Sequence, residues 1–353
     1  MVVPVVLTFN RGYAKQACVA MYTALKNSNS DTLYHFYVVS NDLNDEDKQF
    51  FNKNLQDPRL QKLDFVTLPQ SLYDSIPLVC EFGKETNFRF FLPELLPDLK
   101  KVLYIDSDTL ILGDLTELYK TNVDKVACAG VSEIGLYQTR YYSLHSPFYT
   151  SRVEFLEKNG LNILEQHYIN AGVMVVNLDY WRQHNYTARC MEFLTQNKSN
   201  EYFLYPDQDT LNVLFAQDGI DGKVLLDCKY NCTEDLLLSR YEGLDISRQL
   251  LFFARGYDVD RSKSFRPVIM HFVGGVKPWN GYCWQMGPAY VEYAQEIGWE
   301  IKIKKSSIVK RLAKFVYKVA YNLTPIGLMK VLRKHKSFFK RLVPRRIANM
   351  VKR

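Results

Sequence analysis

Residues 101–112 read KVLYIDSDTLIL, an apolar run that passes through two carboxylates and then becomes apolar again. In an extended segment residues i and i+2 share a face, so we expect Asp106 and Asp108 to project together, roughly 6 to 7 Å apart at the base of their side chains. At an effective dielectric of about 20, two like charges at that spacing repel by about 2 to 3 kcal/mol, and a bound divalent cation would turn the repulsion into attraction. The stretch therefore predicts a strand that carries a metal site for a diphosphate.

Strands and helices alternate along the chain before this stretch. Alternation of this kind predicts a parallel sheet, and the polar turn after the first strand lies where open α/β sheets bind nucleotides. No GxGxxG motif follows that strand, so a dinucleotide-binding fold is not supported. The expected elements are strands at 2–7, 34–40 and 64–68, helices at 14–25 and 45–55, and a turn at 8–13.

Three later elements carry further candidate site residues. Residues 85–96 are expected to form a helix that carries Arg89, either as a surface charge or as a guanidinium for a carboxylate or phosphate. A buried strand at 168–178 is entered through Asn170 and Ala171. Asp207 looks like the N-cap of the helix that begins there, and capping does not explain Gln208 beside it.

The second stretch with clear chemistry is VIMHFVGGVKPW at residues 268–279. A strand places His271 at its end, Gly274 and Gly275 let the backbone approach a ligand closely, and Lys277 follows on a turn stiffened by proline. Histidine supplies a neutral metal ligand and lysine a point charge for phosphate. A lone histidine at a strand end is more often structural, but the combination within seven residues favours a site.

The net charge of +7 is distributed unevenly. Residues 301–353 carry 17 Lys or Arg and no Asp or Glu, which leaves 28 bases against the 38 acids in residues 1–300. Within this tail Ile308, Leu312, Phe315 and Val319 recur at helical spacing. This pattern predicts basic amphipathic helices at an anionic membrane surface rather than a nucleic-acid-binding segment, and a solvated basic face without a partner is the alternative.

The seven cysteines are scattered, with no CxxC pair, as is typical of reduced thiols in the cytosol. Cys228 and Cys232 lack a second pair of ligands, so zinc is not predicted. The N-terminus lacks the basic start of a signal peptide, and no run reaches the roughly 18 apolar residues of a membrane span. Residues 137–167, rich in Tyr and Phe, are expected to form an inserted lid or acceptor loop, or else a local hydrophobic cluster.

The motifs LYIDSD, YINAGVMVVNL, PDQDTLN and HFVGGVKPW occur in this order, and with them the chain resembles the retaining hexosyltransferases of glycosyltransferase family 8 over roughly residues 2–285. That family includes bacterial lipopolysaccharide galactosyl- and glucosyltransferases and, more distantly, glycogenin. The resemblance implies a GT-A-type α/β fold, a mixed and mainly parallel sheet flanked by helices, over residues 1–300, followed by the basic amphipathic tail at 301–353.

The resemblance also implies the site. Asp106, Asp108 and His271 would hold Mn²⁺ or Mg²⁺, and the ion would bridge both phosphates of a UDP-hexose donor, consistent with oxygen-rich coordination. The donor would further contact residues of three kinds. The family's uridine-contacting turn corresponds to Thr8, Asn10 and Tyr13. The diphosphate would contact Lys277 and the backbone about Gly274 and Gly275, and Ser107 would be a further donor contact. The donor sugar would contact Arg89, Asn170, Ala171, Asp207 and Gln208.

Family members usually have alanine and aspartate where this chain has Thr8 and Asn10, and many have a sugar-binding aspartate at the position of Ser132. Retention without a glutamate nucleophile favours attack by the acceptor on the same face as the leaving UDP. Gln208, with Asp207 and Asn170 beside it, would then stabilise the oxocarbenium-like state.

These features together predict a cytoplasmic enzyme, peripheral on the inner face of the membrane. It would move galactose or glucose from a UDP-sugar to a lipopolysaccharide or another glycan or lipid-linked acceptor, and no nucleic-acid partner is expected. A UDP-sugar-binding protein without turnover and a nucleic-acid-binding protein are the alternatives.

Overall fold

The computed structural model describes residues 1–79, 83–133, 147–219, 222–233, 266–275, 277–280 and 286–302. Its strands are β1 (Val2–Thr8), β2 (Leu33–Val39), β3 (Leu60–Val66), β4 (Lys101–Ile105), β5 (Thr109–Ile111), β6 (Cys128–Ser132), β7 (Ile169–Asn177), β8 (Lys223–Leu225), β9 (Cys232–Thr233) and β10 (Ile269–His271). A seven-stranded sheet has the order β3-β2-β1-β4-β7-β6-β8, and a three-stranded sheet has the order β5-β10-β9.

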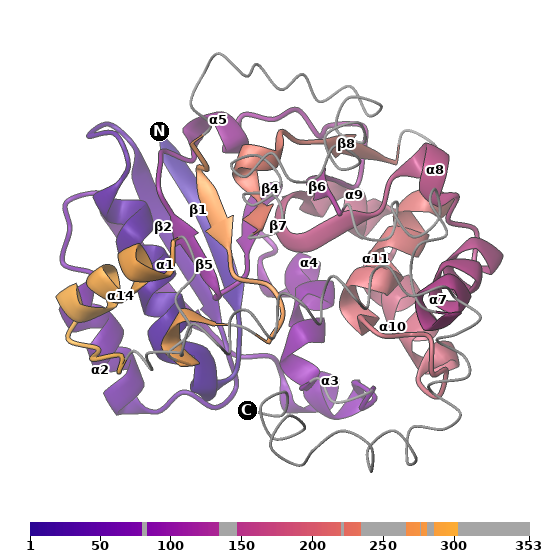
Figure 1. The fold of residues 1–353 in the computed structure, drawn as a ribbon, viewed down its shortest axis with the longest axis horizontal. Coiled ribbons are helices and arrows are strands. Elements are labelled where there is room, and N and C mark those ends of the chain that lie inside the picture. The colour runs from indigo at the N-terminus through magenta and orange to yellow at the C-terminus, as the bar shows by residue number, and fades with distance from the viewer. Residues whose placement is uncertain are drawn as a thin grey trace, which may run out of the picture.

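Helices cover both faces of the larger sheet (Figure 1). The α-helices are α1 (Ala14–Lys26), α2 (Asp45–Asn54), α3 (Gln70–Ser75), α4 (Leu92–Leu95), α5 (Thr116–Tyr119), α7 (Pro147–Lys158), α8 (Ile163–Gln166), α9 (Leu178–Gln183), α10 (Tyr186–Asn197), α11 (Pro206–Gln217) and α14 (Gly287–Glu296). Short 3₁₀ helices are η1 (Arg11–Tyr13), η2 (Lys84–Phe91), η3 (Cys228–Tyr230) and η4 (Pro278–Asn280).

The large sheet is mixed and mainly parallel, as predicted. Strand β1 runs parallel to β2 and β4, β2 runs parallel to β3, and β6 runs parallel to β8. Strand β7 is antiparallel to both of its neighbours, β4 and β6. The N-terminal end of β7 therefore meets the carboxyl end of β4, which brings Asn170 and Gly172 next to Asp106.

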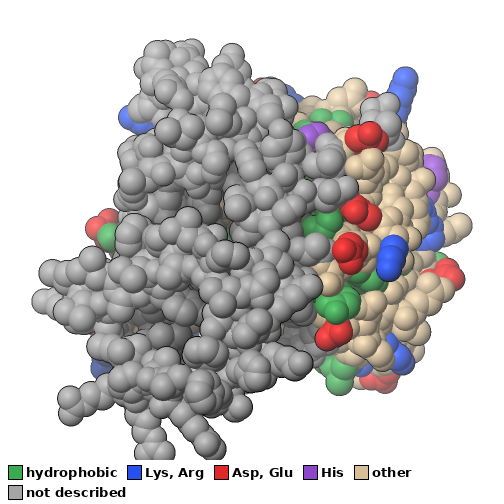
Figure 2. Space-filling model, turned by 45° about the vertical axis from the view of Figure 1, so that its right-hand side comes forward, with side chains coloured by type: hydrophobic (Ala, Val, Ile, Leu, Met, Phe, Trp, Pro, Cys, Tyr) green, Lys and Arg blue, Asp and Glu red, His purple; other side chains and the backbone are tan. Residues whose placement is uncertain are grey.

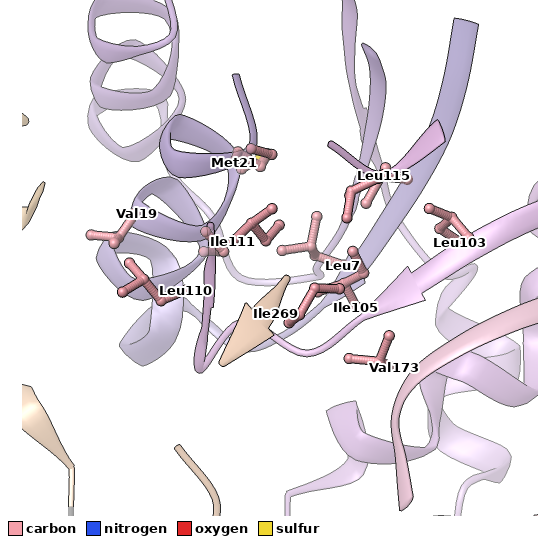
Figure 3. Packing of buried hydrophobic residues seen from close by; sticks show 14 of the residues in the cluster. Leu7, Val19, Met21, Leu103, Ile105, Leu110, Ile111, Leu115, Val173 and Ile269 are labelled. Atoms are coloured by element: carbon pink, nitrogen blue, oxygen red, sulfur yellow. The ribbon is translucent and has the colours of Figure 1, made fainter. Parts of the chain in front are cut away.

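Two hydrophobic clusters fill the two faces of the sheet because successive side chains of each strand point to opposite sides. In β4, Leu103 and Ile105 belong to the cluster under α1, α2 and α14, and Val102 and Tyr104 belong to the cluster under α9, α10 and α11. Figure 3 shows how the first cluster also includes the small sheet, with Ile111 of β5 and Ile269 of β10 packed against Leu7. The small sheet is thereby held against the large one.

Residues 101–112 do not form the single strand that the sequence predicted. The apolar run is divided into β4 and β5 by a turn at Ser107 and Asp108, and β5 pairs with β10 instead of continuing in the large sheet. Asp106 and Asp108 are therefore not on one extended strand, and the prediction of that strand is wrong. Their carboxylates still lie close together, as expected, because the turn brings Asp108 beside Asp106.

The segment 85–96 is also not one helix. It forms η2 followed by α4, with Pro93 in the first turn of α4, where the missing N–H of proline costs no hydrogen bond. Of the predicted insertion 137–167, residues 147–166 include α7 and α8, whose Leu156 and Ile163 are buried in the second cluster. The rest of the aromatic segment up to residue 146 lies outside the described residues.

Of the basic tail, 301–353, only Ile301 and Lys302 are among the described residues. None of the described helices has the length and hydropathy needed to cross a lipid bilayer. On the coloured part of the surface in Figure 2, acidic, basic and apolar side chains are interspersed, so that face does not carry charge of one sign.

A fully buried ion pair joins α7 to α11. Arg152 donates to Asp209 at 2.6 Å, and their side chains are 2% and 0% exposed. Tyr168 at the start of β7 donates to the same carboxylate oxygen at 2.5 Å. Removing one member of such a pair leaves an uncompensated buried charge, which costs more than the intact pair contributes.

We expect the substitution Arg152→Met to lower the free energy of unfolding by about 3 to 5 kcal/mol, because the buried Asp209 carboxyl group loses its ion-pair partner. Urea denaturation followed by circular dichroism would measure this loss. The matched control is Lys120→Met, which removes the exposed pair with Glu117 and should change stability little. Equal effects of the two substitutions would contradict the prediction.

Candidate active site

Asp106, Asp108 and His271 converge at the carboxyl end of β4, although 163 residues separate Asp108 from His271. One ligand atom from each lies within 4.8 Å of the others. The Nε2 atom of His271 is 3.1 Å from Asp108 Oδ1 and 3.8 Å from Asp106 Oδ2. The antiparallel pairing of β10 with β5 produces this approach, since it places His271 opposite Thr109. The expected meeting of the two segments is confirmed.

One carboxylate oxygen of Asp106, Oδ1, is occupied by hydrogen bonds within the protein. Its Oδ1 atom accepts hydrogen bonds from Arg89 at 3.0 Å and from the Tyr104 hydroxyl at 2.8 Å. Tyr104 in turn lies 2.9 Å from the hydroxyl of Thr8. These contacts leave Asp106 Oδ2 to face His271, so the site keeps one carboxylate oxygen of Asp106 available to a cation.

Arg89 is buried at 4% exposure, so the alternative that it is a surface charge is wrong. Its guanidinium also donates to the carbonyl of Ala171 at 2.9 Å and pairs with Asp207 at 3.0 Å. Its planar group lies 4.3 Å from the centre of the Tyr104 ring. Arg89 therefore joins β4, β7 and the start of α11 around one fixed positive charge.

Asp108 is held by a second cation. The Nζ atom of Lys277 donates to Asp108 Oδ2 at 2.5 Å and also to the carbonyl of Phe272. Burial alone would raise the pKa of Asp108, but His271 and Lys277 outweigh it and hold that pKa below its ordinary range. Asp108 is therefore a carboxylate at neutral pH.

The residues fit a divalent cation. Three carboxyl groups, Asp106, Asp108 and Asp207, contact two basic side chains, Arg89 and Lys277, so acidic groups outnumber basic ones in these pairs. Two carboxylate oxygens and one imidazole nitrogen form a donor set suited to Mn²⁺ or Mg²⁺. The Asp106 and His271 side chains have room to meet because residue 172 is glycine. A Cβ there would lie 2.7 Å from Asp106 Oδ2 and would collide with the His271 ring.

Asp207 is not the N-cap that the sequence predicted. The N-cap position is Tyr205, without a side-chain cap, because Pro206 lacks an N–H and occupies the first helical position. Asp207 follows in the first turn, where its carboxylate pairs with Arg89. Burial raises the pKa of Asp207 in spite of that pairing.

Gln208 is held at both ends of its amide. Its Oε1 atom accepts from the backbone N–H of Ala171 at 2.8 Å, and its Nε2 atom donates to the Tyr168 hydroxyl at 3.1 Å. Tyr168 is the residue that donates to Asp209 of the buried ion pair. The orientation of the Gln208 amide is therefore defined by the protein in the absence of a ligand.

The turn 8–13 lies beside the loop that follows β10. Tyr13 is 36% exposed, and its ring packs edge-on against Trp279 with centroids 6.2 Å apart. Asn10 is half-buried in the same turn. Thr8 and Ser107 are buried, and Gly274 has a φ of 75°, a conformation that favours glycine. The turn 8–13 and the segment that follows β10 therefore lie next to each other.

Several residues of the site were not predicted from the sequence. Tyr104, which lies within the predicted strand, bonds Asp106, and Tyr168 orients Gln208. Asn231 lies between His271 and Asn170. No local pattern identifies Asn231, since its partners are distant in sequence, whereas the i, i+2 spacing of Tyr104 and Asp106 could have indicated their contact.

The comparisons with known proteins agree with this architecture. The family model described as "Glycosyl transferase family 8" matches residues 4–283. General stress protein A of Bacillus subtilis is 22% identical over 76% of this chain and 84% of its own length. Lipopolysaccharide glucosyltransferase WaaO of Escherichia coli is 22% identical over 80% of this chain and 76% of its own length. A putative glycosyltransferase of Haemophilus influenzae and glycosyltransferase GlyF of Streptococcus pneumoniae are matched over 58% and 54% of their own length.

Among solved structures, the galactosyltransferase LgtC in complex with donor and acceptor sugar analogs aligns with a TM-score of 0.66 at 23% identity. The alignment covers 88% of this chain and 99% of that one. The fold is therefore of the GT-A type. The chain belongs to glycosyl transferase family 8, a family of glycosyltransferases.

We expect Gly172→Ala to weaken Mn²⁺ binding by about tenfold or more, because the added methyl group occupies space taken by the His271 ring and Asp106 Oδ2. Electron paramagnetic resonance of free Mn²⁺ would measure the affinity. The matched control is Gly113→Ala, whose added Cβ would make its closest contact, with Val268, at an ordinary 3.5 Å. Unchanged binding in Gly172→Ala would contradict a cation site at this position.

Proposed function

We propose that this glycosyltransferase moves a hexose, galactose or glucose, from a UDP-sugar to a glycan acceptor, with a divalent metal held by Asp106, Asp108 and His271. The observation that carries the proposal is the convergence of these ligand atoms within 4.8 Å at the carboxyl end of β4. Carboxyl ends of strands are where α/β sheets bind nucleotides, and the turn 8–13 lies at the same edge. The names of WaaO, a glucosyltransferase, and LgtC, a galactosyltransferase, support a hexose as the transferred group.

The cofactor is Mn²⁺ or Mg²⁺, which when bound supplies Lewis-acid stabilisation of the departing UDP. Lys277, which pairs with Asp108, would add a positive charge at the diphosphate once a cation satisfies Asp108. The backbone at Ser107 and Gly274 would also contact the donor. Tyr13, exposed on the turn, offers a ring for stacking on uracil, and Asn10 offers an amide to the base.

The donor sugar would lie against Arg89, Asn170, Ala171, Asp207 and Gln208. Arg89 holds the Asp207 carboxylate, and the Ala171 N–H holds the Gln208 oxygen, so these groups are pre-oriented. An amide is a poor nucleophile, and its fixed dipole is suited to stabilise positive charge at the anomeric carbon. We therefore infer retention through attack by the acceptor on the face that UDP leaves, with the leaving oxygen taking the acceptor proton.

The acceptor is proposed to be lipopolysaccharide or another surface glycan, by analogy with the name of WaaO. Residues 301–353 would hold the enzyme at the inner face of the cytoplasmic membrane, since each Lys or Arg near an anionic leaflet contributes about 1 kcal/mol. A nucleic-acid partner is not part of this proposal.

The function is tested by Mn²⁺-dependent hydrolysis of UDP-glucose and UDP-galactose. We expect Asp108→Ala to lower the rate by about a hundredfold or more, because it removes a metal ligand and the partner of Lys277. The exposed Asp124→Ala is the matched control and should keep the wild-type rate. Tight UDP binding without turnover on any UDP-sugar would instead identify a binding protein without catalytic activity.

Membrane association is tested by flotation with vesicles that contain anionic lipids. The full chain should float with them, and a chain that ends at Lys302 should not, because it loses the basic tail but keeps Ile301 in the core. Neutral vesicles and added RNA are the controls for charge and for a nucleic-acid partner. Equal flotation of both chains would refute the anchor.

A further inference from the structure

Asn231 lies in the connection between η3 and β9 and is 1% exposed. Its Oδ1 atom is 2.9 Å from His271 Nδ1, and its Nδ2 atom is 2.9 Å from Asn170 Oδ1 and 3.5 Å from the Asn170 carbonyl oxygen. A single buried amide thus joins a metal-ligand candidate to a residue on the sugar side of the site.

The donor and the acceptor in each of these hydrogen bonds can be assigned, starting from the backbone N–H of Gly172. The N–H of Gly172 can only donate, and it lies 2.9 Å from Asn170 Oδ1. An amide nitrogen at that position would place two donors against each other, so the oxygen of Asn170 must face Gly172. Because the same oxygen faces Asn231, Asn231 must present its NH₂ group there.

The carbonyl oxygen of Asn231 then faces His271. An oxygen acceptor at Nδ1 requires the imidazole to carry a proton on Nδ1, and in the neutral ring the lone pair is then on Nε2. Nε2 is the atom that faces Asp108 Oδ1 at 3.1 Å and Asp106 Oδ2 at 3.8 Å. A bare lone pair on Nε2 facing two carboxylate oxygens is unfavourable, so a positive charge belongs at this point, either a proton on Nε2 or a metal ion that takes the proton's place.

The strand pairing keeps this arrangement rigid. Strand β9 begins directly after Asn231 and pairs with β10 so that Thr233 is opposite His271. Asn170 lies on β7, two residues before Gly172, whose carbonyl oxygen accepts a hydrogen bond from the backbone N–H of Asp106 at 2.7 Å. Asn231 is therefore fixed between two strands that carry site residues.

We propose that Asn231 is a positioning residue that holds His271 in the Nδ1–H tautomer needed for metal binding, and that Asn170 determines the orientation of the Asn231 amide. The inference rests on the proposed function, in which this site binds a divalent cation. Residues that orient metal-ligating histidines in this way typically change metal affinity by about 10- to 100-fold when they are removed.

The experiment measures Mn²⁺ binding to the full chain, without any sugar donor, by electron paramagnetic resonance. Asn231→Ala should weaken binding by about tenfold or more. Asn231→Asp keeps an acceptor for the Nδ1–H group and should stay within about threefold of the wild type, at the low end of such effects. Asn177→Ala is the matched control, because Asn177 is also a buried asparagine with two hydrogen bonds, to Val123 and Tyr180, at the far end of β7.

Asn170 provides the second arm of the test. Asn170→Ala removes the acceptor that orients Asn231 and should weaken Mn²⁺ binding several-fold, although Asn170 is not a ligand. Asn170→Asp restores an acceptor for both Gly172 and Asn231 and should restore the affinity. A thermal melt of each variant separates these effects from loss of folding, since Asn177→Ala should lower the melting temperature without changing Mn²⁺ affinity.

Wild-type protein that fails to bind Mn²⁺ would overturn the proposed metal site and this inference with it. If the wild type binds and Asn231→Ala binds equally well, the metal site stands and the inference fails. Weak binding by Asn231→Asp, equal to that of Asn231→Ala, would also overturn it, because the acceptor at Nδ1 would then not be the cause.

Discussion

Two carboxylates of like charge, Asp106 and Asp108, are held close together in a largely buried part of the molecule, and the surrounding structure compensates them. Each has one oxygen occupied by a fixed cation, Arg89 for Asp106 and Lys277 for Asp108. The remaining oxygens face His271. Charges that are buried in this way persist only when they are paired. Here one oxygen of each carboxylate has no fixed cation beside it, and a divalent ion would supply the matching positive charge.

The topology of the sheet explains why these groups can meet. Strand β7 runs antiparallel to β4, so its first residues lie at the end of β4 where Asp106 emerges. Gly172 stands at that point without a side chain, and the His271 ring and Asp106 use the space. The small sheet of β5, β10 and β9 then brings His271 and Asn231 in from a distant part of the chain. A chain of hydrogen bonds runs from the Gly172 N–H through the Asn170 and Asn231 amides to the imidazole of His271.

The sequence indicated which residues belong to the candidate site, but it did not show which side chains contact one another there. The acidic pair and the His271 to Lys277 segment were both identified, because strand, turn and glycine patterns are local. Arg89 and Asp207 were recognised only as possible contacts, and their pairing with each other was not foreseen. For Asp207 the local capping rule gave the wrong position, since Pro206 displaced it and a distant guanidinium took its carboxylate.

From the sequence by itself, the alternation of strands and helices predicted a parallel sheet, and four short motifs showed the resemblance that implied the mixed sheet and the metal-ligand candidates. Such patterns can be read from a sequence because they depend on neighbours within a few residues. Only the tertiary structure decided that Asp106 and Asp108 are oriented by a turn, which oxygen of each remains open, and that Asn231 stands behind His271. These features depend on contacts between β4, β7, β9 and β10, whose residues are tens to more than a hundred positions apart. Such contacts arise from packing and hydrogen-bond geometry, which local spacing does not encode.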